Sequence, residues 1–182
     1  GGYMGWLWEG DREMTYLMGH TRWPSHCSVM NPANNHPLVV PVPVSDQPGA
    51  AGPPVDRMRS AMGSLALTHN GSLRAWERHF TRLQVPRTTQ VDSELLARIA
   101  QRHAGATGLA LDAILADLSP LEGSMSLALV ATSRPEEIIL VKGNMPLEVR
   151  IHPRTRVLLY ASEARIIERA LGRQDGWETF PL

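Results

Sequence analysis

Gly19-His20-Thr21-Arg22-Trp23-Pro24-Ser25-His26 is the stretch on which the interpretation of this chain depends. Two later stretches complement it, His69-Asn70-Gly71 and Asp92-Ser93-Glu94. An arginine such as Arg22 can bind a carboxylate through two parallel hydrogen bonds. An aspartate can accept an ammonium group, and an Asn-Gly turn can direct a side-chain amide and a backbone N–H at one oxygen. Together the three stretches predict a pocket for a small zwitterion with a polarised carbonyl.

The composition favours one globular domain over residues 1–182. Eighteen basic residues balance eighteen acidic ones, so we expect neither a nucleic-acid nor a membrane partner. The single cysteine, Cys27, excludes an internal disulfide and favours a reducing, cytoplasmic location. The histidines of the first half stand in separate turns without carboxylates or thiolates at ligand spacing, so we predict no metal site. No cofactor is expected.

Strand signals dominate the first part of the chain. The pattern predicts strands at Tyr3–Trp8 and Thr15–Met18. Leu38–Val44 is β-like, but its prolines restrict it to an edge or an extended connector. Residues 46–60 are rich in proline, glycine and alanine, which predicts a flexible surface insertion. Ser64–Thr68 is then expected to be a strand that leads into a turn at Asn70-Gly71.

Helices follow, then strands, then a helix. Ser72 can cap a helix with Leu73, Trp76, Phe80 and Leu83 on one face. Asp92 or Ser93 can cap the next helix. The remaining elements are predicted at Ala110–Leu118 (helix), Ser124–Ala131, Ile138–Lys142 and Arg156–Ala161 (strands), and from Ser162-Glu163 to Leu171-Gly172 (helix). This order favours an α+β fold with antiparallel sheet.

Each site residue also has a purely structural interpretation. Arg22 can be an ordinary surface or ion-paired arginine beside a packed Trp23. Asn70-Gly71 can be a strand-to-helix turn in which glycine supplies an unusual backbone angle. Asp92 can be a helix N-cap, which is worth about 1 kcal/mol. The functional interpretation gains its weight from the three motifs occurring together.

Taken together, these motifs resemble the class II glutamine amidotransferase domain of the N-terminal-nucleophile hydrolases. The resemblance covers nearly the whole chain and keeps the family order. The matching stretches are Gly19–His26, Asn35-His36-Pro37, His69–Leu73, Asp92-Ser93-Glu94, Leu121–Ser124, Gly143–Leu147 and Tyr160–Glu163.

The resemblance implies a four-layer αββα sandwich of two mainly antiparallel sheets that hydrolyses glutamine to glutamate and ammonia. By matching position, Arg22 would bind the substrate carboxylate and Asp92 its amino group. Asn70 and Gly71 would form the oxyanion hole, which stabilises negative charge in the transition state. A lid-like loop over the glutamine would be shaped by Trp23, Ser25 and His26.

The chain departs from the family at the nucleophile, which is an N-terminal cysteine. Gly1 has no side chain, and Cys27 stands where the family commonly has glycine. The first hypothesis is therefore an amidotransferase domain whose N-terminal Cys segment is missing from this chain, so that the chain alone is inactive. The alternatives are a non-catalytic glutamine-binding sensor or regulatory subunit, and a relocated nucleophile at Cys27.

The resemblance also bears on partners and stability. The family implies an ammonia-accepting synthase domain or subunit, and a homo-oligomer is possible. Loss of the first strand would expose apolar surface and unpaired backbone groups. We therefore expect this chain to be marginally stable alone, or to associate with a partner that fills the gap.

Overall fold

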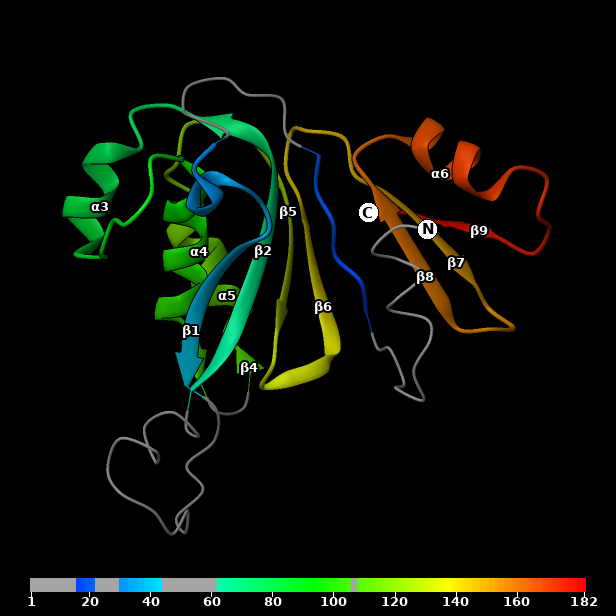
Figure 1. The fold of residues 1–182 in the computed structure, drawn as a ribbon, viewed down its shortest axis with the longest axis horizontal. Helices are drawn as coiled ribbons and strands as arrows, with labels where there is room; N and C mark the ends of the chain where they lie inside the picture. The colour runs from blue at the N-terminus through cyan, green and yellow to red at the C-terminus, as the bar shows by residue number, and fades with distance from the viewer. Residues whose placement is uncertain (1–15, 22–29, 44–61, 106–107) are drawn as a thin grey trace, which may run out of the picture.

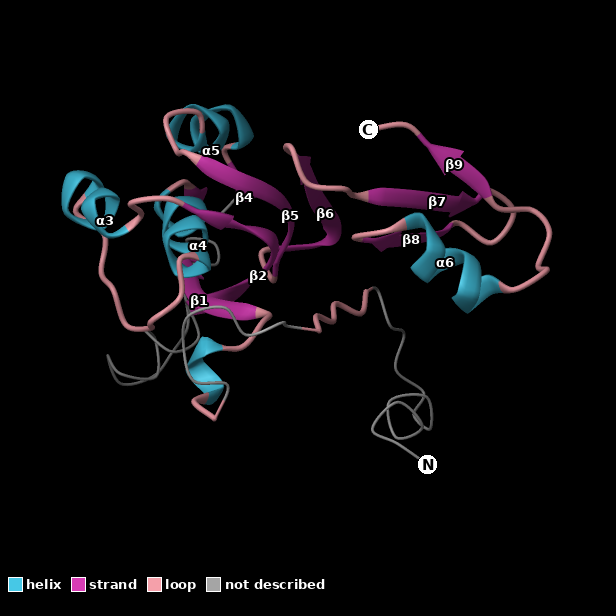
Figure 2. Cartoon of the chain, turned by 90° about the horizontal axis from the view of Figure 1, so that it is seen from above, coloured by secondary structure: helices cyan, strands magenta, loops and turns pink. Residues whose placement is uncertain are grey.

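The computed structural model describes residues 16–21, 30–43, 62–105 and 108–182. Its elements form two main antiparallel sheets, of four and three strands, and a small two-stranded sheet, with helices packed against the two main sheets (Figure 1). Helices α3 (Glu77–Leu83), α4 (Ser93–Arg102) and α5 (Leu111–Leu118) lie on one side of the four-stranded sheet. The three-stranded sheet and helix α6 (Ala164–Leu171) lie on the other. Figure 2 shows the same separation from above. This α+β sandwich confirms the fold class predicted from the sequence.

The larger sheet has the strand order β1-β2-β5-β6. Its strands are β1 (Leu38–Pro43), β2 (Met62–Leu73), β5 (Gly123–Ala131) and β6 (Arg134–Lys142). All neighbours are antiparallel, and Leu67 pairs with Leu38 on one side and Leu129 on the other. The prolines of β1 fit its edge position, because proline cannot donate to a ladder on both sides. Of the two predicted alternatives, an edge strand and an extended connector, the structure confirms the edge strand.

Helix α4 (Ser93–Arg102) is the main helical contact of this sheet. Residues 93–100 of α4 are all buried, since the helix packs on β1, β2 and α5 (Leu111–Leu118). The core between helix and sheet includes fully buried leucine and isoleucine side chains of Leu65, Leu67, Leu95, Leu96, Ile99, Ile114, Leu127 and Leu129. Burial of each such side chain contributes about 1.5–3 kcal/mol to folding.

Shorter elements complete this half of the molecule. They are η1 (Pro32–Asn34), α3 (Glu77–Leu83), β3 (Ala104–Gly105) and β4 (Gly108–Leu109). The helix α5 begins and ends within one residue of its predicted bounds.

The smaller sheet has the order β8-β7-β9 and comes entirely from the C-terminal part of the chain. Its strands are β7 (Glu148–His152), β8 (Val157–Ala161) and β9 (Glu178–Phe180). Helix α6 (Ala164–Leu171) contacts β8 and ends at Gly172, as predicted. None of the helices in the described ranges is both long and apolar enough to cross a membrane.

Three local predictions are wrong. Strand β2 does not end at Thr68 but continues to Leu73, so Asn70 and Gly71 lie within a paired strand. Ser72 therefore caps no helix, and α3 begins only at Glu77. Residues 16–18 belong to no strand. The predicted strand Tyr3–Trp8 and the insertion at residues 46–60 lie outside the described residues.

Candidate functional site

A pocket of about 490 Å³ lies where the two sheets face each other. This volume falls in the range of ligand pockets, roughly 300–1,000 Å³. Its walls come from segments far apart in the sequence: the stretch before Arg22, strands β2 and β5, the β6–β7 connection, and β8 with the start of α6. The described lining residues with polar side chains are His20, Thr21, Thr68, Asn70, Ser126, Tyr160 and Ser162.

The start of the Gly19–His26 stretch lies in this pocket. Gly19, His20 and Thr21 all line it. The ring of His20 lies 4.4 Å from that of His36, centroid to centroid, so the stretch contacts the Asn35-His36-Pro37 motif. The predicted binding residues Arg22, Trp23, Ser25 and His26 lie outside the described residues, as does Cys27.

Asn70 reaches the pocket from strand β2, where it pairs with Ser126 of β5. Its Nδ2 donates a weak hydrogen bond to the carbonyl of Pro146, at 3.4 Å. Because an amide nitrogen carries two N–H donors, this contact leaves the second for a ligand. The sequence therefore identified a pocket residue, although it placed that residue in a turn rather than a strand.

Gly71 follows Asn70 and permits a close approach of two strands. Its φ of 143° is unfavourable for residues with a side chain. A Cβ at this position would lie 2.0 Å from the carbonyl oxygen of Ser124. Glycine is required here on steric grounds alone. The oxyanion-hole role of its N–H stays a prediction.

Asp92 caps helix α4, as predicted. One carboxylate oxygen accepts a hydrogen bond from the backbone N–H of Ser93, at 2.9 Å. The other accepts from the N–H of Leu73 at the end of β2, at 2.7 Å. Asp92 thereby joins the Asn70-Gly71 strand to α4, but it is not among the described residues that line the pocket. Its ammonium-binding role stays a prediction.

His69 adds a second link between the same two motifs. Its ring is 3% exposed, and Nδ1 lies 2.8 Å from the hydroxyl of Ser93 while Nε2 lies 3.2 Å from the carbonyl of Ser124. Burial lowers the pKa of His69, and the charge of Asp92 opposes that shift. From the sequence, His69 belonged to the His69-Asn70-Gly71 motif but was assigned no role of its own. The signal that could have found it is its position directly before Asn70 in a buried strand.

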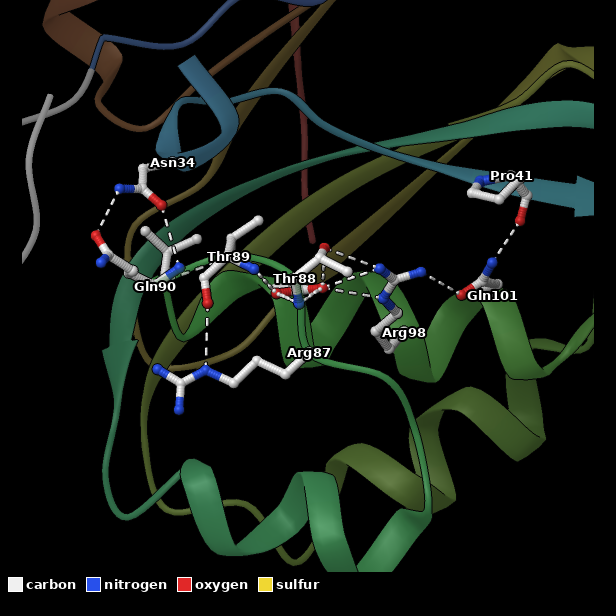
Figure 3. A network of polar contacts seen from close by, with 10 residues as sticks. Asn34, Pro41, Arg87, Thr88, Thr89, Gln90, Arg98 and Gln101 are labelled. Carbon is white, nitrogen blue, oxygen red and sulfur yellow. Dashed lines mark hydrogen bonds and ion pairs between the residues drawn. The ribbon is translucent and has the colours of Figure 1, made fainter. Parts of the chain in front are cut away.

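Glu94 organises the loop before α4 through a buried carboxylate. Its partners Thr88, Thr89 and Arg98 are labelled in Figure 3. The carboxylate accepts hydrogen bonds from the N–H groups of Thr88 and Thr89, at 2.6–2.9 Å. It also forms an ion pair with Arg98, at 2.9 Å. Burial alone would raise the pKa of Glu94, but the hydrogen bonds from Thr88 and Thr89 outweigh it and the pKa lies below its ordinary value.

Asn34 connects the loop before α4 to the η1 turn. It is fully buried and exchanges two hydrogen bonds with Gln90, each 3.1 Å long. The segment that leads into Asp92 is thus tied both to α4 and to the η1 turn before β1 (Figure 3). This arrangement fixes the N-terminus of α4 relative to the sheet.

Tyr160 brings a phenol to the pocket from the second sheet. Its hydroxyl is buried and makes no hydrogen bond of ordinary geometry with the described residues. Burial raises the pKa of Tyr160, and the nearby hydroxyl of Thr68 opposes the rise. The phenol is therefore neutral at physiological pH and can serve a ligand only as a neutral donor or acceptor.

Among the described residues, no group of three or more His, Cys, Asp or Glu side chains is arranged to hold a metal ion.

Comparisons with known proteins agree with this architecture. No protein-family model matches the chain. It is 25% identical over 138 residues to a glutamine–fructose-6-phosphate aminotransferase (isomerizing) of Neisseria meningitidis serogroup A, covering 74% of this chain and 19% of that protein. The enzyme of the same name from Xanthomonas campestris pv. campestris is 26% identical over 140 residues, covering 75% and 19%. The chain thus spans about a fifth of the length of these relatives.

Two solved structures share the fold. One is the glutamine phosphoribosylpyrophosphate amidotransferase from B. subtilis complexed with ADP and GMP, with a TM-score of 0.56, 20% identity, and coverage of 88% of this chain and 33% of that one. The other is an allosteric regulatory enzyme of purine biosynthesis, with a TM-score of 0.52, 21% identity, and coverage of 81% and 27%. The sequence relatives and the first structure are glutamine-dependent transferases, which supports the resemblance predicted from the motifs.

Proposed function

We propose that this chain is a glutamine amidotransferase domain that binds glutamine in the pocket between its two sheets. The observation that carries the proposal is the convergence of the motifs. The Gly19–Thr21, Asn70, Pro146-Leu147 and Tyr160–Ser162 segments are distant in sequence, yet all line one pocket. Each belongs to a stretch that resembles the amidotransferase family, and the named relatives use glutamine.

In the proposed complex, Arg22 pairs with the α-carboxylate of glutamine. Asp92, at the start of α4 and outside the described pocket lining, would accept the ammonium group. The side-chain carboxamide then lies toward strand β2, where the Asn70 amide and the Gly71 N–H donate to its oxygen. Trp23, Ser25 and His26 close over the ligand. Such donors stabilise the negative charge that develops on the oxygen when the carbonyl is attacked.

The proposed reaction is hydrolysis of glutamine to glutamate and ammonia. An N-terminal cysteine thiolate, supplied by a segment not present in this chain, attacks the carboxamide carbon. Ammonia leaves with a proton from the cysteine's own amino group, and water then hydrolyses the γ-glutamyl thioester. The ammonia passes to a synthase domain or subunit. This scheme predicts that residues 1–182 alone bind glutamine but do not release glutamate.

Calorimetric titration of the chain with glutamine tests the binding step. We expect saturable binding that Arg22→Ala abolishes and Asn70→Ala weakens. Gln174→Ala removes a side-chain amide from an exposed position outside the pocket lining and serves as the matched control. Absence of glutamine binding by the unmodified chain would contradict the proposal.

A glutamate-release assay distinguishes a catalytic amidotransferase domain from a non-catalytic glutamine-binding protein. A chain extended by its N-terminal Cys segment should release glutamate. Binding without release from the extended protein would favour a glutamine sensor. If Cys27 were instead the nucleophile, Cys27→Ser would abolish covalent labelling of this chain by a glutamine-like electrophile.

A further inference from the structure

His69 and Ser93 stand next to two residues of the proposed site without being part of it. His69 directly precedes Asn70 on β2, and Ser93 directly follows Asp92 at the start of α4. Both side chains are almost fully buried, at 3% and 2% exposure, and neither lines the pocket. The contact between them therefore joins the two motifs from the side that faces the core.

The surroundings of the ring select one tautomer of His69. The carbonyl of Ser124 can only accept a hydrogen bond, so the Nε2 atom that lies 3.2 Å from it must carry a proton. In a neutral ring Nδ1 is then an acceptor, and the hydroxyl of Ser93, 2.8 Å away, donates to it. Every polar atom of the ring thereby has one defined partner.

The same contacts fix the backbone around Asn70 and Asp92. The Ser124 carbonyl, which accepts from His69, is also the group that a side chain on Gly71 would strike. The Ser93 hydroxyl lies 3.4 Å from one oxygen of Asp92, and the other oxygen accepts from Leu73. Strand β2, strand β5 and helix α4 thus meet at one imidazole.

We propose that His69 and Ser93 are positioning residues for the proposed glutamine site. The Nε2–H tautomer of His69, held between the Ser124 carbonyl and the Ser93 hydroxyl, sets the distance between Asn70 and Asp92. Because Asn70 lines the pocket and Asp92 does not, the link acts on the ligand through the placement of Asn70. The inference rests on the proposed function for its ligand, but the tautomer and the link do not depend on it.

Ser93→Ala removes the hydroxyl that donates to His69, and Ser93→Thr keeps it. Loss of one buried hydrogen bond corresponds to about a five- to tenfold change in an equilibrium constant. We therefore expect Ser93→Ala to weaken glutamine binding about five- to tenfold, while Ser93→Thr stays within about twofold of the unmodified chain. Ile114→Val is the control, because it lowers thermal stability from a buried site on α5 without touching the link.

Nitrogen NMR of the imidazole rings reads the tautomer directly in the unmodified chain. We expect the shifts of a neutral His69 ring protonated on Nε2, and we expect Ser93→Ala to move the side-chain amide signals of Asn70 while Ile114→Val leaves them in place. A ring protonated on Nδ1, or an Asn70 amide that does not respond to Ser93→Ala, overturns the inference.

The two proposals can fail separately. If the unmodified chain binds no glutamine, the proposed function fails and the NMR measurements still decide the link. If the unmodified chain binds glutamine and Ser93→Ala binds it equally well, the positioning role fails and the proposed function stands.

Discussion

Replacing Glu94 by glutamine should destabilise the fold strongly, although the substitution preserves size and shape. The carboxylate is 2% exposed and accepts from Thr88, Thr89 and Arg98 at distances of 2.6–3.1 Å. Glutamine offers one acceptor oxygen and places an NH₂ group against backbone donors. It also leaves the Arg98 guanidinium, whose side chain is 10% exposed, without its counter-charge.

Breaking a buried ion pair by removing one partner costs about 3–5 kcal/mol. The whole folding free energy of a domain is about 5–15 kcal/mol. Glu94→Gln should therefore remove a large share of the stability, measured as the free energy of unfolding in urea at pH 7. Glu168→Gln makes the same change at an exposed position on α6 and should stay within about 0.5 kcal/mol of the unmodified chain.

The effect has a defined pH dependence. The pKa of Glu94 in the folded chain is lowered, so the stability it contributes is fully present above the unfolded pKa and is lost as the pH falls through the folded pKa. The difference in unfolding free energy between the unmodified chain and Glu94→Gln should therefore shrink as the pH falls below the ordinary glutamate pKa of about 4.3. A loss below about 1 kcal/mol at pH 7, or a difference that grows toward acid, would refute the reasoning.

Two other substitutions test the fold itself. Gly71→Ala should lower the free energy of unfolding by about 2–6 kcal/mol, through backbone strain and the contact with the Ser124 carbonyl. Gly172→Ala, where the added Cβ has nothing within 4 Å, should lower it by only about 1–2 kcal/mol. Thermal unfolding measures both losses. Equal losses would show that the strands do not approach closely at Gly71. Leu67→Ala should cost about 2–5 kcal/mol by leaving a cavity at a fully buried site, and Val39→Ala, at 61% exposure, should cost far less in the same assay. A small effect at Leu67 would contradict its place in the core.

Much of the architecture was predictable because most of its helices and strands follow from patterns within short stretches of sequence. The apolar runs of β5 and β6, the 3.6-residue period of α5 and the glycine that ends α6 each sit within one element. The prolines of β1 predicted an edge strand, since they limit backbone pairing. Strands β7 and β9 were not predicted. Strand β9 has only three residues, and its pairing partner β7 lies some thirty positions earlier in the sequence.

The error at Asn70-Gly71 has a specific physical cause. An Asn-Gly pair usually indicates a turn, because glycine tolerates positive φ. Here the same freedom lets β2 remain paired with β5 at close range. The chain bends instead at Ala75, which has a φ of 45°, and α3 begins two residues later. Only the distant partner strand decides between these outcomes.

For the candidate site, the binding and catalytic roles read from the motifs stay predictions. Asn70 lines the pocket, and Asp92 caps α4, which is the purely structural interpretation that the sequence offered for it. The links from His69 to Ser93 and from Asp92 to Leu73 join residues about twenty positions apart across two elements. No sequence period reports such contacts, because they depend on how β2 packs against α4.

The central claim is that glutamine binds between the two sheets, and NMR mapping of the isotopically labelled chain tests it most directly. On titration with glutamine, the account predicts saturable shifts of the backbone or side-chain amides of Gly19, Asn70, Ser126 and Ser162, with little change at residues of β9. Shifts confined to other surfaces, or no shifts at millimolar glutamine, would contradict it.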